Sequence, residues 1–245
     1  MMTPNVGTWA LIPVKRFGEA KQRLSGLLSN DERAFLARVM LEDVLRALSQ
    51  IDELAGVLVV TDDDGVQSVA HDAGVDAIVD KSTAGMNAAI VAGQRALGQL
   101  SKAIVVLPGD IPQLSVDDLR TVLHDLNESL IVAAPAKRDG GTNLLAAAPS
   151  GALAPEFGPR SFARHVEGAR RRGIALRIRR LASIELDLDR GDDIAEFMEL
   201  PSSTRTHRYL ADLSVVARLR QPHRQNSTVQ EDKYLSADYV EPSSH

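Results

Sequence analysis

Three aspartates occupy positions where strands of a parallel sheet should end. Asp110 follows the apolar run 105–107 and stands between two prolines. This is typical of a buried strand that delivers one carboxylate to the carboxyl edge of an open α/β sheet. Asp187 and Asp189 lie in the segment 185–189, which we predict to be a strand, so their side chains should point the same way, about 6.6 Å apart. Oxygen ligands of this kind, near glycine turns, indicate Mg²⁺ and a nucleotide.

Each aspartate alone has a simpler explanation. Asp110 could cap a turn, and Asp187 and Asp189 could lie on a solvated strand face. The three together are harder to explain in this way, because unpaired carboxylates that lie close together repel. A divalent cation relieves that repulsion and also binds phosphate oxygens. The three aspartates are therefore the predicted metal ligands.

A basic loop follows the first apolar strand, 8–13. It contains Lys15, Lys21 and Arg23, and in an open sheet it lies at the same edge as Asp110. Lysine offers a point charge to phosphate, and arginine offers a two-pronged donor. A solvated cationic loop would have the same residue types, but the position after the first strand favours phosphate binding. The chain lacks the glycine patterns of P-loop kinases and of Rossmann dehydrogenases, which argues against both.

Two glycine turns add candidate ligand-binding groups. The turn 140–143 offers backbone amides, a hydroxyl and a side-chain amide. Gly158 precedes Ser161, which we place at a helix N-terminus, where free amides bind anions. Asn87 stands at the start of another predicted helix and could equally recognise a base or begin the helix. His165 could reach the same site as Ser161, but we interpret it as a buried structural histidine.

These groups are positioned by apolar strands that alternate with amphipathic helices. This order is typical of βαβ units and predicts a three-layer α/β/α sandwich with a mostly parallel central sheet. We predict a nucleotide-binding domain over residues 1–200 and a polar tail over 201–245, with one helix at 209–219 and disorder from 221. The predicted strands are 8–13, 56–61, 75–79, 103–107, 130–134, 144–148 and one or two within 174–188; the predicted helices are 29–50, one after 62, 85–100, 115–127, 161–172 and 192–200.

Composition limits the function classes. The 245 residues include no cysteine and carry a formal net charge of −5. Disulfides and thiolate chemistry are therefore excluded, and there is no general attraction to nucleic acid or to an anionic membrane. We find no signal peptide and no apolar run of about 18 residues. We expect a cytoplasmic enzyme.

Seven motifs, in order, resemble the 2-phospho-L-lactate and phosphoenolpyruvate guanylyltransferases of coenzyme F-420 biosynthesis. That family belongs to the wider nucleotidyltransferases, which include the molybdopterin guanylyltransferases. The similarity extends over residues 8–200, and the combination is specific although no single motif is. The motifs are LIPVK at 11–15, AKQRLS at 20–25, GMN at 85–87, LPGDIP at 107–112, GTN at 141–143, FGPRSF at 157–162 with His165, and LDLD at 186–189.

The resemblance implies a nucleotide-diphospho-sugar-transferase-like fold, with GTP as donor and a small phosphorylated acid as acceptor. It implies Mg²⁺ on the three aspartates and triphosphate neutralisation by the basic loop. It also implies acid binding by Thr142, Gly158 and Ser161, to which we add Asn87 and Arg160. Because Arg160 occupies a variable place, the acceptor stays open among phosphoenolpyruvate, 2-phospho-L-lactate and 3-phospho-D-glycerate. A downstream transferase should accept the activated product, and a homodimer is left open.

Two alternatives stay open at this stage. The first is another nucleotidyltransferase of the same fold, using CTP or a sugar phosphate. The second is a non-catalytic nucleotide-binding module, which would bind GTP without releasing pyrophosphate. The presence of all three aspartates and of both basic-loop lysines, Lys15 and Lys21, argues against the second alternative, since a mere binder could lose them.

Overall fold

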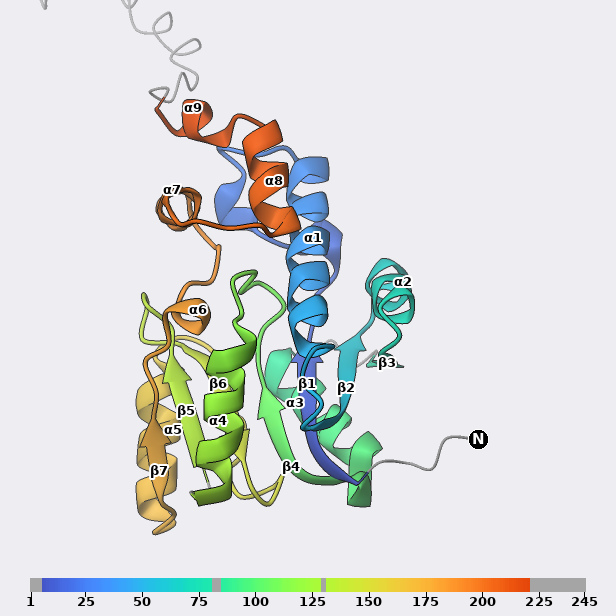
Figure 1. Cartoon of the computed structure of the whole chain (residues 1–245), viewed down its shortest axis with the longest axis vertical. Coiled ribbons are helices and arrows are strands. Elements are labelled where there is room, and N and C mark those ends of the chain that lie inside the picture. The colour runs from blue at the N-terminus through green and yellow to red at the C-terminus, as the bar shows by residue number, and fades with distance from the viewer. Residues whose placement is uncertain (1–5, 81–84, 129–130, 221–245) are drawn as a thin grey trace, which may run out of the picture.

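The computed structural model describes residues 6–80, 85–128 and 131–220. Its centre is a seven-stranded sheet of order β3-β2-β1-β4-β6-β5-β7 (Figure 1). Strands β1 to β4 run parallel, β6 is antiparallel to both β4 and β5, and β7 is parallel to β5. The strands are β1 Gly7–Pro13, β2 Leu54–Thr61, β3 Asp76–Val79, β4 Ser101–Val106, β5 Ile131–Pro135, β6 Thr142–Ala147 and β7 Leu176–Ile178.

Helices cover both faces of this sheet. One apolar cluster joins α1, α2 and α4 to one face, and a second joins α3 and α5 to the other. The predicted three-layer α/β/α sandwich is therefore confirmed. None of the described helices is long and apolar enough to cross a membrane. The helices are α1 Asn30–Leu48, α2 Asp64–Asp72, α3 Met86–Leu97, α4 Val116–Glu128, α5 Ser161–Arg171, α6 Ala182–Glu185, α7 Gly191–Glu199, α8 Arg205–Asp212 and α9 Val215–Arg220, with 3₁₀ turns at Phe17–Glu19, Gln22–Leu24 and Gly98–Leu100.

Strand β1 shows why both faces are covered. Ala10 and Ile12 belong to the cluster under α1, while Trp9 and Leu11 belong to the cluster under α3. A central strand that is apolar on both faces must be buried on both, and all four side chains are. Helix α3 approaches β1 closely at Gly93, where a Cβ atom would lie 2.4 Å from the Leu11 side chain. Any larger residue at this position would force the buried Leu11 side chain to move.

A third apolar cluster lies at the carboxyl end of the sheet, beneath the predicted site. It combines Leu24 of the basic loop with Leu186 and Leu188, and packs them against α1, α7, α8 and α9. Our prediction of a strand at 185–189 is wrong: Glu185 ends α6, and the residues after it form no strand. The alternation of leucine and aspartate still holds, because buried leucines alternate with half-buried aspartates.

The described part of the tail packs against the rest of the chain. In place of the single helix predicted at 209–219, the structure has α8 and α9, separated at Ser214, whose φ of 51° is left-handed. Asp43 of α1 accepts hydrogen bonds from the backbone amides of Arg205 and Thr206 and from the buried Thr206 hydroxyl. Figure 1 shows α8 beside α1. The disorder predicted from residue 221 lies outside the described residues.

Candidate active site

Lys21 joins two of the three predicted metal ligands. Asp110 lies in the loop after β4, and its Oδ2 atom is 2.5 Å from Lys21 Nζ. The same nitrogen is 2.7 Å from Asp189 Oδ1, and Arg23 Nη1 is 3.3 Å from Asp189 Oδ2. The backbone amide of Leu188 also donates to the carbonyl of Asp110, at 3.3 Å. Three segments far apart in the sequence therefore meet at this point.

The Lys21 ammonium is held inside the protein by this pairing. Its side chain is only 5% exposed, and its backbone adopts a left-handed conformation with φ 54°. Such a conformation costs a non-glycine residue about 1 kcal/mol or more. Burial alone would lower the pKa of Lys21, but the charges of Asp110 and Asp189 outweigh it and raise the pKa. The lysine is therefore a permanent cation of the site.

Asp187 lies beside the same cluster in a different environment. Burial, followed by the negative charge of Asp110, raises its pKa to about 6. The Asn143 side-chain amide donates to Asp187 Oδ1 at 3.2 Å. The same amide nitrogen donates to the carbonyls of Ile184 and Glu185 at 2.9 and 3.0 Å, and so fixes the turn that carries the aspartate.

The three carboxylates can be tested for their fit to a divalent cation. Asp110 Oδ1 is buried, and no hydrogen-bond partner for it lies in the described part of the chain. Within those same residues, no group of three or more acidic, histidine or cysteine side chains is arranged around a common point as metal ligands would be. The Lys21 ammonium lies between Asp110 and Asp189. Mg²⁺ usually takes one or two protein carboxylates, and Asp110 with Asp187 meets that requirement.

The two glycine turns come together as the second half of the site. The backbone amide of Phe162 donates to the carbonyl of Gly140 at 3.1 Å. A Cβ atom on Gly140 would lie 3.6 Å from the Arg160 Cα, so the turns are in contact. Gly158 adopts a φ of 122°, which L side chains rarely adopt. Arg160 itself is exposed.

Three side chains form a buried hydrogen-bond network where these turns meet. Ser161 Oγ donates to Thr142 Oγ1 at 3.1 Å, and His165 Nδ1 lies 3.0 Å from the same oxygen. His165 Nε2 accepts from the backbone amide of Glu156 at 3.0 Å. The histidine is fully buried, in agreement with our interpretation of it as structural.

Two other predicted site residues have different surroundings. The Asn87 side chain donates to the carbonyl of Phe157 at 3.2 Å and accepts from its amide at 2.8 Å. Asn87 therefore holds the turn before Gly158, and both the oxygen and the nitrogen of its side-chain amide take part. Lys15 is exposed in the loop after β1. Among the described residues, no hydrogen bond or ion pair joins it to the cluster of Lys21, Arg23, Asp110 and Asp189.

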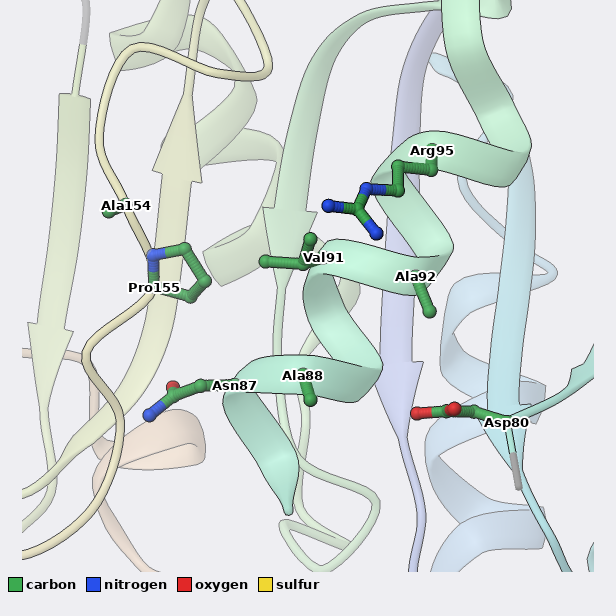
Figure 2. A pocket seen from close by; sticks show the side chains of 8 residues that line it. All are labelled: Asp80, Asn87, Ala88, Val91, Ala92, Arg95, Ala154 and Pro155. Atoms are coloured by element: carbon green, nitrogen blue, oxygen red, sulfur yellow. The ribbon is translucent and has the colours of Figure 1, made fainter. Parts of the chain in front are cut away.

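Two cavities of the described structure are close to predicted site residues. The smaller, of about 200 Å³, borders the carboxylates and is lined by residues of both charges: Arg23, Arg138, Asp139, Asp187, Asp189, Arg190, Asp192 and Asp193. The larger, of about 520 Å³, lies over α3. Figure 2 shows Asn87 pointing from α3 toward the Pro155 segment, with Asp80 on the other side of the helix. Among the predicted site residues only Asn87 lines the larger cavity, whereas three of them line the smaller one.

Comparison with known proteins decides the family. Residues 8–232 match the model of the family described as "Guanylyl transferase CofC like". The chain belongs to this CofC-like family. It is therefore a nucleotidyltransferase of the guanylyltransferase type, as the sequence motifs implied.

Relatives of this CofC-like protein carry different acceptor names. A 3-phospho-D-glycerate guanylyltransferase of Phenylobacterium zucineum is 38% identical, over 83% of this chain and 95% of that protein. A phosphoenolpyruvate guanylyltransferase of Conexibacter woesei is 38% identical, over 82% and 91%. A 2-phospho-L-lactate guanylyltransferase of Methanothermobacter thermautotrophicus is 32% identical, over 84% and 91%.

A solved structure supports the fold of the CofC-like chain. The protein from Desulfovibrio desulfuricans titled a nucleotide-diphospho-sugar transferase superimposes with a TM-score of 0.73 at 19% identity. The match covers 88% of this chain and 97% of that one. The expected nucleotide-diphospho-sugar-transferase-like fold is confirmed.

The sequence analysis missed the contacts that two residues of the CofC-like site make. Asn143 belongs to the predicted glycine turn, but its bond to Asp187 joins residues 44 positions apart. Asp193 accepts from the backbone amides of Asp189 and Arg190 at 3.1 and 2.7 Å. An acidic residue in the first turn of a helix is the usual signal of such a cap, and this signal was available.

Proposed function

We propose that this CofC-like protein transfers GMP from GTP to the phosphate of a small phosphorylated acid and releases pyrophosphate. The observation that carries the proposal is the meeting of Lys21, Asp110 and Asp189 beside Asp187 at the carboxyl end of the sheet. In α/β sheets this edge is where ligands bind. The acceptor class comes from the names of the relatives.

The proposed chemistry needs no protein base. A phosphate monoester has a second pKa near 6 and is largely ionised at neutral pH. One of its oxygens would form a bond to the α-phosphorus of GTP, while the bond from that phosphorus to the β-phosphate oxygen breaks. Pyrophosphate takes the electron pair as it leaves. Alignment and neutralisation of charge then account for the rate.

The residues of this chain divide those two tasks. Lys21 and Arg23 supply positive charge where the triphosphate meets the carboxylates. We place the acid against Thr142 and Ser161, since the helix N-terminus at Ser161 and the Thr142 hydroxyl suit its anionic oxygens. Gly158 brings the backbone of the turn close to that group without a side chain in the way.

We propose that Asp110 and Asp187 hold Mg²⁺. Magnesium ions, when bound, neutralise developing charge on the phosphate oxygens. Asp110 Oδ1 has no hydrogen-bond partner among the described residues, and this fits a bound cation, as does the raised pKa of Asp187. Asp189, paired with Lys21 and Arg23, then serves mainly to hold those cations. The activated product would be a phosphoanhydride, which a later transferase in coenzyme F-420 biosynthesis would consume.

The test is to incubate the protein with Mg²⁺ and GTP and to offer each of the three acids in turn. Pyrophosphate release is measured together with the mass of the product. Release with GTP and one acid, but not with CTP or a sugar phosphate, is the expected result. GTP binding without release for any acid would favour a non-catalytic module and refute the proposal.

A further inference from the structure

The buried histidine behind the acid-binding turn has a fixed protonation state. Burial, with a smaller contribution from the charge of Arg164, lowers the pKa of His165 to about 4. The ring is therefore neutral at pH 7 and carries one proton. Its Nε2 atom accepts from the Glu156 amide at 3.0 Å, so the proton must be on Nδ1.

This tautomer determines what the Thr142 hydroxyl can do. The Nδ1–H group of His165 donates to Thr142 Oγ1 at 3.0 Å, and Ser161 Oγ donates to the same oxygen at 3.1 Å. A hydroxyl oxygen has two lone pairs and one proton. Both lone pairs of Thr142 are occupied, so its own proton must be donated, and neither of these two neighbours can accept it.

We infer that His165 is a positioning residue for the acceptor: it holds Thr142 as a hydrogen-bond donor toward the substrate. The inference rests on the proposed function, and it specifies which kind of substrate group the Thr142 hydroxyl can bind. Only a group that accepts hydrogen bonds, such as a phosphate or carboxylate oxygen, can pair with it. A substrate hydroxyl there could pair only as an acceptor.

The surroundings keep the histidine in this one arrangement. The Phe157 ring meets the imidazole edge-on, with 5.0 Å between the ring centroids. Asn87 holds the Phe157 backbone through two hydrogen bonds. The other tautomer would place an Nε2–H group against the Glu156 amide N–H, so that contact excludes it and fixes the polarity of Thr142.

Two amide variants, each of which replaces one ring nitrogen of His165, separate positioning from simple structural support. His165→Asn places an amide N–H near the Nδ1 position and keeps the donor to Thr142. His165→Gln places a carbonyl near the Nε2 position, which keeps the Glu156 contact and loses that donor. We expect His165→Gln to raise KM for the acid about 10- to 100-fold, as for a lost hydrogen bond to a charged group. KM for GTP should not change, and His165→Asn should stay within about threefold of wild type.

Thr142→Val supplies the coupling test. Without the hydroxyl, His165→Gln should have no further effect on KM for the acid or on its affinity measured by calorimetry. Equal effects of the two histidine variants, or additive effects with Thr142→Val, would overturn the inference while leaving the proposed function intact. A wild-type protein that neither binds nor consumes any of the three acids would overturn both.

Discussion

Replacing Asp187 with asparagine should stabilise the metal-free protein at alkaline pH and inactivate it. Burial and the charge of Asp110 raise the pKa of the Asp187 carboxyl from 3.8 to about 6. A carboxyl group whose pKa is raised by folding favours the folded state below its unfolded pKa and loses that advantage as pH rises through the folded pKa. Asparagine has the same shape and cannot ionise. Its Oδ1 atom can still accept from Asn143.

The size of the effect follows from the displacement of the pKa. The pKa of Asp187 rises from 3.8 to about 6 on folding. At 1.36 kcal/mol per pKa unit, this changes the free energy of unfolding by about 3 kcal/mol between low and high pH. The difference between Asp187→Asn and wild type should therefore grow from near zero below pH 4 to about 3 kcal/mol above pH 7. This is a large fraction of the net stability of a typical domain.

The assay is urea unfolding in EDTA at a series of pH values between 4 and 8. Asp189→Asn is the matched control, because Lys21 and Arg23 overcome the effect of burial and lower the pKa of Asp189. A lowered pKa stabilises the fold above the unfolded value, so this variant should be less stable than wild type at pH 8. Mg²⁺ should stabilise wild type more than Asp187→Asn. An Asp187→Asn variant no more stable than wild type at pH 8 would refute the reasoning.

Three further predictions concern the groups around this cluster. Lys21→Met should abolish measurable pyrophosphate release, whereas Lys15→Met, at an exposed position outside the cluster, should slow it less; equal losses would contradict the central place given to Lys21. Asp43→Ala leaves the buried Thr206 hydroxyl without its acceptor and should cost about 2 kcal/mol in urea unfolding; an unchanged midpoint would show that α8 is not held by this contact. Asn143→Leu should lower kcat by releasing the Asp187 turn, with GTP binding retained; wild-type kcat would contradict that role.

The order of elements was predictable because it depends on local pattern. The apolar run of β4 is present as expected, and the helix predicted from residue 29 begins with a capping box at Ser29 and Glu32. The segment 185–189 was misread because alternation shows only that a chain is extended with one buried side. It does not show that a neighbouring strand is available to pair with it.

The site was predictable by residue type and less so by role. The sequence brings Lys21 and Asp110 to one edge of the sheet, because loops after parallel strands share that edge. It does not show that Lys21 lies between two carboxylates, or that Asn87 is used to hold Phe157. Those facts depend on contacts between residues tens of positions apart, which no local pattern encodes.

The charges of the cluster explain why the carboxylates differ. The three aspartates lie near two basic side chains, Lys21 and Arg23. Both of these contact Asp189, and Lys21 also contacts Asp110. Asp187 has neither as a direct partner, and burial together with the charge of Asp110 raises its pKa. The folded protein thus keeps the Asp187 carboxylate without a cation in contact, near Asp110, whose Oδ1 atom has no hydrogen-bond partner in the described part of the chain. A cation that binds there is attracted by negative charge already in place. The ionised Asp187 lowers the folding stability of the metal-free protein, and binding of the cation removes that cost and so gains affinity.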